Sequence, residues 1–246
     1  MTEQFFAQKK KYARGAKVID IKVNDLAKIT VPIPPLPVQE EIVRILDKFT
    51  ELEAELEARR KQYEFYRDKL LNFKGIGADI TRGGYKLMSL GEIISSLRTG
   101  LNPRQNFRLN TDDSVFNYIT VRELNVFTVS PTNKTDKIND AALKIINGRS
   151  HLQFGDILFS ATGTIGRTAL IDEHDVKWNV KEGVYVLTVD ANIVNQRFLI
   201  YYFHSTDAIN QFTQAAEGGT VKSISMEKFK KISITIPPIA EQERIV

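Results

Sequence analysis

The sequence predicts an α+β protein in which a mainly-β globular domain is joined to one long coiled-coil helix. Three observations favour this class: apolar residues at heptad spacing over residues 39–73, short alternating segments over residues 85–238, and a segment repeated near the two ends of the chain. With 246 residues, 42% of them hydrophobic, the chain has room for one large domain and an accessory element.

The long helix is predicted over residues 39–74. Its apolar positions follow alternating steps of three and four, and only Arg59 interrupts them. At about 1.5 Å per residue such a helix is roughly 50 Å long, which is too long to bury its seam against a small domain. We therefore expect it to pair with another helix through Ile42, Ile45, Phe49, Leu52, Leu56, Tyr63, Tyr66 and Leu70. Residues 75–84, which contain four glycines, are predicted to be a linker.

The globular domain is predicted over residues 85–238. Strand-like alternation is found in FNYITVRELNVFTVS, GDILFSATGTIGRTALI and VYVLTVD, and YKLMSLGEIISSLRTG reads as a strand followed by a short helix or turn. The segment NQRFLIYYFHSTDAINQFTQ has apolar residues at helical spacing. The domain is therefore expected to be α+β with mainly β character.

An internal repeat links the two ends of the chain. The segment GAKVIDIKVNDLAKITVPIPPLPVQEEIV begins at Gly15, and GGTVKSISMEKFKKISITIPPIAEQERIV begins at Gly218, an offset of 203 residues without a gap. Alternating apolar residues predict a strand at 29–33 and at 232–236, the Pro-Pro pair ends each strand, and Gln-Glu opens a helix. In the second copy this helix would begin at residues 239–246.

Composition excludes several classes of protein. The chain has no cysteine, so disulfides and Cys-ligated zinc are excluded. It has no apolar run of about 18 residues and no secretory signal at its start, so we expect a cytoplasmic protein without a membrane partner. Residues 1–38 carry seven Lys/Arg against three Asp/Glu, whereas residues 39–73 carry seven against nine. A polyanion should therefore meet the flanks of the helix rather than the helix itself.

The order of three segments, GDILFSATGTIGRTALI (155–171), NQRFLIYYF (195–203) and the second repeat copy (218–246), resembles the specificity subunit of type I restriction-modification systems. ITVPIPPLPVQEEIVRILDKFTELEAELEARRKQYEFYRDKLL (29–71) is similar to the junction after a recognition domain together with its spacer helix. The resemblance implies that residues 85–238 are a target recognition domain and that residues 1–38 are the tail of a preceding one.

The resemblance also implies a mechanism. Each recognition domain of the family reads one half of a split target in double-stranded DNA, and two long antiparallel helices set the spacing between the half-sites. These helices dock modification subunits, which bind S-adenosylmethionine and methylate adenine, and a restriction subunit that uses ATP and Mg can join. The specificity chain itself would be non-catalytic, with no cofactor, no metal site and no catalytic residues.

A recognition domain needs side chains that reach base edges and phosphates. Four polar clusters are candidates, and each has a structural alternative as a solvated loop, a turn or a packed aromatic. The first comprises Arg98, Thr99, Asn102, Arg104, Gln105 and Asn106. The others are Ser160, Thr162, Thr164 and Arg167; Lys177 and Asn179, which flank Trp178; and Thr220, Lys222 and Ser223.

This sequence departs from the family pattern because it holds one full recognition domain and one full helix. Two copies could pair their spacer helices and read a symmetric split site as a homodimer. The alternative function is an oligomerising coiled-coil scaffold whose β domain binds protein. A stand-alone nuclease or methylase is disfavoured, since Pro34-Pro35 and Pro237-Pro238 follow Ile rather than the Asn or Asp of a methylase motif.

Overall fold

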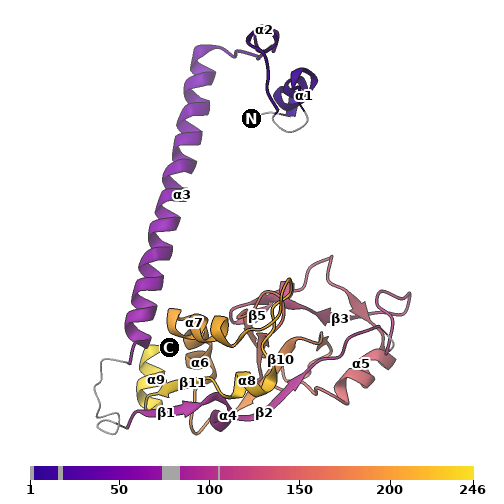
Figure 1. The fold of residues 1–246 in the computed structure, drawn as a ribbon, viewed down its shortest axis with the longest axis vertical. Helices are drawn as coiled ribbons and strands as arrows, with labels where there is room; N and C mark the ends of the chain where they lie inside the picture. Colours follow the sequence, from indigo (N-terminus) through magenta and orange to yellow (C-terminus); the bar gives the residue numbers. More distant parts are fainter. Residues whose placement is uncertain (1–2, 16–18, 74–83, 105) are drawn as a thin grey trace. The chain divides into compact units, whose positions relative to one another are not determined.

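The computed structural model describes residues 3–15, 19–73, 84–104 and 106–246. It divides into two compact units, Met1–Lys61 and Gln62–Val246, and the division falls within the long helix. The long helix and the β-sheets together confirm the predicted α+β class (Figure 1).

The first unit is helical in its described residues. It contains α1 (Glu3–Tyr12), α2 (Val23–Leu26) and most of α3 (Leu36–Leu71). The strand predicted at residues 29–33 is wrong, because these residues have no regular structure. A strand needs a neighbour to complete its hydrogen bonds, and here the side-chain amide of Gln8 instead bonds both the N–H and the carbonyl of Thr30, each at 2.9 Å.

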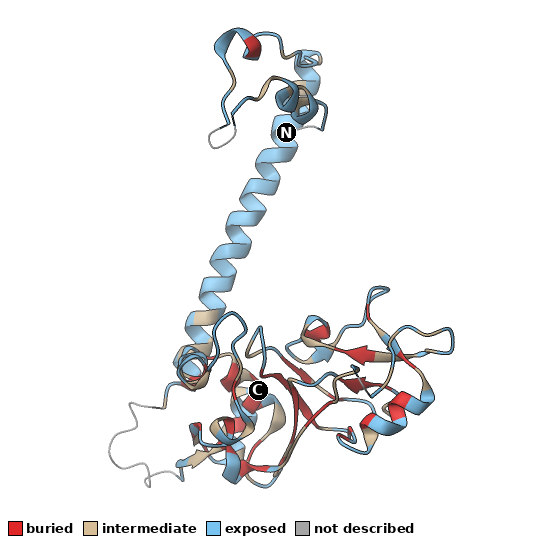
Figure 2. Ribbon diagram, turned by 45° about the vertical axis from the view of Figure 1, so that its right-hand side comes forward, coloured by how far each residue is buried: buried red, intermediate tan, exposed pale blue. Residues whose placement is uncertain are grey.

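The helix α3 begins before the predicted Gln39 and ends before the predicted residue 74. Leu36 follows Pro35, whose carbonyl accepts the first helical hydrogen bonds from Val38 and Gln39. Pro37 fits the first turn because its missing N–H would have no partner there. At about 1.5 Å per residue the helix is about 54 Å long, and Figure 2 shows it exposed over nearly all of that length.

The second unit holds the β-structure. Its strands are β1 (Lys86–Ser89), β2 (Ile94–Thr99), β3 (Phe116–Ile119), β4 (Leu124–Asn125), β5 (Thr128–Val129), β6 (Lys137–Ile138), β7 (Ile157–Ser160), β8 (Thr168–Leu170), β9 (Asn179–Val180), β10 (Val184–Val189) and β11 (Ser233–Ile236). Its helices are α4 (Leu90–Ile93), the 3-10 turn η1 (Val121–Glu123), α5 (Asp140–Asn147), α6 (Gln196–Phe203), α7 (Thr206–Ala215), α8 (Met226–Lys230) and α9 (Ile239–Ile245). The predicted helical segment after residue 195 is thus two helices, since Ser205 caps a new one.

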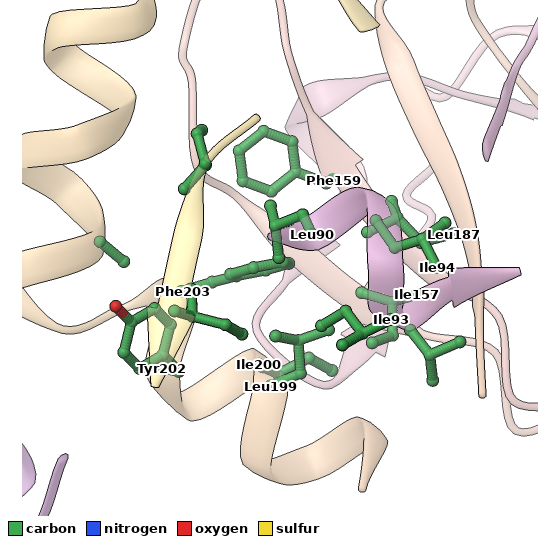
Figure 3. Close-up of a cluster of buried hydrophobic side chains, with 14 of the residues drawn as sticks. Leu90, Ile93, Ile94, Ile157, Phe159, Leu187, Leu199, Ile200, Tyr202 and Phe203 are labelled. Atoms are coloured by element: carbon green, nitrogen blue, oxygen red, sulfur yellow. The ribbon is translucent and has the colours of Figure 1, made fainter. Parts of the chain in front are cut away.

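The central sheet has the strand order β2-β10-β7-β8, and all its pairs are antiparallel. A smaller sheet, β6-β3-β9, contains the parallel pair β3–β9, and β1 pairs with β11. Apolar side chains of the central sheet pack against α4 and α6–α8 (Figure 3). The ring of Phe159 lies 4.8 to 5.4 Å from the rings of Phe203, Phe212 and Phe229. This aromatic core fixes the ends of β7 and β10, from which the exposed loops extend.

The sequence repeat is also a structural repeat. The helices α1 and α2 match α7 and α8 at the same offset of 203 residues, and the Arg14–Asp20 bridge matches the bridge between Glu217 and Ser223. The helices α3 and α9, which end the two copies, begin in the same way. Gln39 of α3 donates to the carbonyl of Pro34 at 2.7 Å, and Gln242 of α9 donates to that of Pro237 at 2.8 Å.

The two copies differ in what covers them. Val31 and Ile33 are 62% and 82% exposed, whereas their equivalents Ile234 and Ile236 are 1% and 4% exposed. Strand β1 and the aromatic core cover the second copy. The first copy therefore presents an apolar face that its equivalent buries.

Candidate nucleic-acid interface

Three of the four predicted clusters meet at one surface of the second unit. The loop after β7 lies against the loop before α8, since Gly163 N–H donates to the carbonyl of Lys222 at 2.8 Å and Thr162 bridges Ser223. The turn between β9 and β10 joins them through Gly183, whose carbonyl accepts from Ala161 N–H at 2.8 Å. Hydrogen bonds within the fold thus bring together segments that are far apart in the sequence.

The first cluster reaches this surface through Thr99. The Thr99 hydroxyl donates to the carbonyl of Val184 at 3.1 Å and accepts from Gly183 N–H at 3.2 Å, so Thr99 is a structural residue. Beyond it, Arg104 and Asn106 are exposed and Asn102 is half-buried. Asn106 donates to the carbonyl of Asn102 at 2.9 Å, which tightens the loop. Gln105 lies outside the described residues.

At Gly100, where this loop begins, only glycine fits. A Cβ added there would lie 1.7 Å from the carbonyl oxygen of Val180, a distance that no side chain tolerates. The close approach of the two backbones brings the first cluster beside the β9–β10 turn.

Arg98 faces the interior instead. Its guanidinium pairs with the fully buried Asp156 at 2.8 Å and donates to the Thr188 hydroxyl at 2.6 Å, with a further short hydrogen bond to the carbonyl of His151. Thr188 in turn donates to Asp156 at 2.5 Å. Because these contacts occupy Arg98, we do not retain it as a DNA contact.

Within the second cluster, Ser160 is buried. Its hydroxyl donates to the carbonyl of Thr164 at 2.6 Å and accepts from Arg167 N–H at 2.8 Å, which closes the loop on itself. Thr162, Thr164 and Arg167 are exposed around that loop, and they remain candidates. In the loop before α8, Thr220 and Lys222 are exposed and Ser223 is half-buried, and they remain candidates too.

The cluster of Lys177 and Asn179, which flank Trp178, does not join the others. Asn179 is fully buried and bonds Ser150 and Asn147, while Trp178 is 8% exposed and its indole donates to Glu173 at 3.2 Å. Lys177 is exposed and pairs with Asp175 at 2.9 Å. The structure thus gives Asn179 a structural role and leaves Lys177 apart from the convergent loops.

Sequence reasoning missed two cations of the surface, Arg122 and Lys181. They line a cavity of about 330 Å³ together with Tyr118 and Thr162. The Tyr118 hydroxyl donates to the carbonyl of Leu101 at 2.6 Å, and burial raises the pKa of Tyr118, so it stays protonated at neutral pH. No local motif marks these residues, because the parallel pairing of β3 with β9 brings them together.

A second cavity of about 430 Å³ lies beside the same loops and is lined by Arg167, His204, Phe212 and Lys222. His204 Nε2 lies 2.9 Å from the hydroxyl of Thr168, and burial lowers the pKa of His204, so the ring is neutral at pH 7. The positive charge at this cavity therefore comes from Arg167 and Lys222.

These observations define a surface that we call the convergent loops. It comprises residues 100–104, 106–107, 161–167, 181–183 and 218–223 together with Arg122. Its exposed cations are Arg104, Arg122, Arg167, Lys181 and Lys222, and its acidic neighbours are Glu123, Asp136, Glu182 and Glu217. Arg122 pairs with Asp136 at 3.6 Å and with Glu123 at 3.8 Å. Such a mixture of cations, hydroxyls and amides suits a polyanion with readable edges.

The predicted pairing face of α3 is uncovered in the chain by itself. Ile42, Ile45, Phe49 and Leu52 are 42 to 60% exposed, and Leu56, Tyr63, Tyr66 and Leu70 are 45 to 71% exposed. Arg59, which interrupts the seam, pairs with Glu55 at 3.6 Å. No described helix is both long enough and apolar enough to cross a bilayer.

Within the second unit, Asp68 joins the last turns of α3 to α7. Its carboxylate accepts from the Thr206 N–H at 3.1 Å and from the Thr206 hydroxyl at 2.6 Å, at the first turn of α7. Although partial burial opposes it, hydrogen bonds from Thr206 and Arg67 lower the pKa of Asp68. The carboxylate is thus ionised at neutral pH and binds the positive end of the α7 dipole.

Comparison with known proteins adds an independent finding. Residues 4–63 and 83–246 match the family described as type I restriction modification DNA specificity domain. The chain is 32% identical over 233 residues to a type I restriction enzyme specificity subunit of Haemophilus influenzae, covering 90% of this chain and 55% of that protein. It is 30% identical over 233 residues to the EcoR124I/EcoR124II specificity subunit of Escherichia coli, covering 89% and 54%.

Solved structures share the fold. The HsdS subunit from Thermoanaerobacter tengcongensis aligns with a TM-score of 0.51 and 19% identity over 99% of this chain and 58% of that chain. The type I restriction-modification S subunit from M. genitalium aligns with a TM-score of 0.57 and 16% identity over 98% and 62%. The chain spans about half the length of the first two curated relatives.

Proposed function

This chain belongs to the family of type I restriction-modification DNA specificity domains, and from that premise we propose that its residues 85–238 read one half of a split target in double-stranded DNA. The observation that carries the proposal is the convergence of polar loops and cations at one surface, where Gly163 meets Lys222 and Gly183 meets Ala161. Arg122, Arg167, Lys181 and Lys222 would hold phosphates, which sets the position of the domain on the duplex.

Base edges would be read by amide, guanidinium and hydroxyl side chains of the convergent loops. Asn102 and Asn106 suit adenine, Arg104 suits guanine, and Thr162, Thr164 and Thr220 suit either a base or a phosphate. Gly163 and Gly166, both at positive φ, let the backbone of the loop approach a phosphate closely.

The helix α3 would set the distance to a second reading domain. Its exposed seam supports pairing with another long helix, and a homodimer would supply one antiparallel partner of equal length. We propose that the paired helices also dock the methyltransferase subunits and that a restriction subunit joins the assembled complex. S-adenosylmethionine, ATP and Mg would belong to those subunits, and this chain would be non-catalytic.

Residues 1–38 would be the tail of a preceding recognition domain. Support comes from the structural repeat, in which α1, α2 and Gln39 match α7, α8 and Gln242. The exposure of Val31 and Ile33 supports it further, because their equivalents are covered by a strand and an aromatic core. Residues 239–246 would begin a second spacer helix.

The proposal predicts how DNA binding responds to salt. Each phosphate contact makes the slope of log K against log salt more negative by about 0.9, so the double variant Arg167→Ala/Lys222→Ala should make it less negative by about 1.8. Fluorescence anisotropy of a labelled duplex between about 50 and 200 mM salt would measure it, with the modification subunits present.

The matched control is Lys144→Ala, an exposed lysine on α5 that is paired with Asp140 and lies outside the convergent loops. It should leave the slope unchanged. Binding that is absent or insensitive to salt in the unaltered chain would instead favour the scaffold function.

A further inference from the structure

A strained valine stands at the tip of the hairpin formed by β4 and β5. Leu124 pairs with Val129 and Asn125 with Thr128, which leaves a two-residue loop, Val126-Phe127. Val126 has a φ of 56°, in the left-handed region that β-branched residues rarely adopt. Loops of this length normally place glycine or asparagine at a position with positive φ.

The surrounding structure holds this conformation in place. The buried Thr168 donates from its hydroxyl to the carbonyl of Val126 at 2.8 Å, and Leu170 N–H donates to the carbonyl of Phe127 at 3.3 Å. The Phe127 ring packs on the Tyr201 ring at 4.9 Å, and the Arg197 guanidinium lies 4.4 Å from its centre. Both loop carbonyls and the Phe127 ring are therefore fixed, so the Val126 side chain is presented in one orientation.

Valine at this position is only partly buried. The residue is 36% exposed, so burial of the remainder offsets part of the backbone strain while part of its surface stays open to solvent. Glycine at this position would relieve the strain without loss of the hydrogen bonds, which involve only the backbone of residue 126. Strained residues that the fold maintains at a surface are typical of binding sites.

The hairpin is joined directly to the convergent loops. Thr168, which holds Val126, is the neighbour of Arg167, and the Arg167 guanidinium reaches back to the carbonyl of Val121 at 3.5 Å. Thr168 also contacts His204, which lines the cavity shared by Arg167 and Lys222. Thr168 thus links the backbone of Val126 to the segment that carries Arg167.

Resting on the proposed DNA function, we propose that Val126 reads a thymine of the half-site. In the major groove the C5-methyl group is the apolar feature that distinguishes thymine, and small apolar side chains recognise it by contact. The valine methyl groups supply such a contact, and the rigid hairpin gives it a fixed position. Val126 is then a specificity residue that no polar motif in the sequence marks.

The test removes either the C5-methyl group of thymine or the methyl groups of Val126. Each thymine of the selected half-site is replaced in turn by deoxyuridine, which lacks only that group, and affinity is measured for the complex of this chain with its methyltransferase subunits. For one of these thymines, the deoxyuridine duplex should bind the unaltered chain about fourfold more weakly than the thymine duplex, which is the effect of one buried methyl group. Val126→Gly should abolish the difference at that position and leave the other positions as they were.

Glycine is favoured at positive φ, so the variant should keep the backbone conformation of the hairpin, and its unchanged binding at the other positions shows that it is folded. Val115→Ala, at a 64% exposed valine outside the hairpin, is the control and should keep the deoxyuridine effect. Equal binding of thymine and deoxyuridine at every position would overturn the proposal, as would an effect that persists in Val126→Gly. In both cases sequence-specific binding would survive, whereas a chain without any sequence preference would contradict the proposed function and this inference with it.

Discussion

The double substitution Ile45→Asp/Leu52→Asp on α3 is expected to convert the proposed dimer of this chain into a monomer. Both side chains lie on the seam and are 42% and 48% exposed in the chain by itself. Burying an apolar side chain of this size contributes about 1.5–3 kcal/mol. A symmetric pair buries four such side chains, each already about half buried in the chain by itself, so their loss should weaken pairing by about 3–6 kcal/mol, on the order of 10²–10⁴-fold.

Light scattering at tens of micromolar measures this change directly, and circular dichroism checks that the helix still forms. The control introduces aspartate at Ala54 and Lys61, which lie on the opposite side of α3 at helical spacing. It should remain dimeric. A mass of one chain for the unaltered protein would contradict the homodimer, and a dimeric Ile45→Asp/Leu52→Asp variant would place the contact elsewhere.

Removing the Asp156 carboxylate is expected to lower the free energy of unfolding of the second unit strongly. Asp156 is fully buried and pairs with Arg98, whose side chain is 19% exposed. Asp156→Ala leaves the guanidinium without its anion, and breaking a buried pair in this way costs about 3–5 kcal/mol. Urea unfolding followed by the fluorescence of Trp178, the single tryptophan and a buried one, reports on this domain.

Glu227→Ala provides the control for an exposed pair. Glu227 and Lys231 are 78% and 71% exposed, and water screens their interaction, so the unfolding midpoint should change little. A small effect of Asp156→Ala would mean that Arg98 does not depend on its buried partner. Arg98 would then return to the set of candidate DNA contacts.

Much of the fold could be predicted from local patterns. The heptad spacing from Ile42 to Leu70 is a property of one segment, and it correctly indicates the helix α3. The apolar runs of β7 and β10 likewise indicate buried strands. The strand expected at residues 29–33 is wrong because alternation alone does not supply the neighbouring strand that β1 gives to β11.

The site was less predictable because the direction of a polar side chain depends on residues far away in the sequence. Arg98 turns inward since Asp156 lies across the sheet, and Asn179 is buried against Ser150 and Asn147. Conversely, Arg122 and Lys181 become neighbours only through the pairing of β3 with β9. Residue type indicated the candidates, and tertiary contacts separated those that face solvent from those that hold the fold.

The central claim is that this chain selects a DNA sequence. The most direct measurement is selection of bound duplexes from a randomised library by the chain assembled with the proposed methyltransferase subunits, followed by sequencing. We expect the bound duplexes to share a split motif with a fixed number of base pairs between its halves. Enrichment of no motif over the starting library, under conditions where the complex binds DNA, would contradict the account.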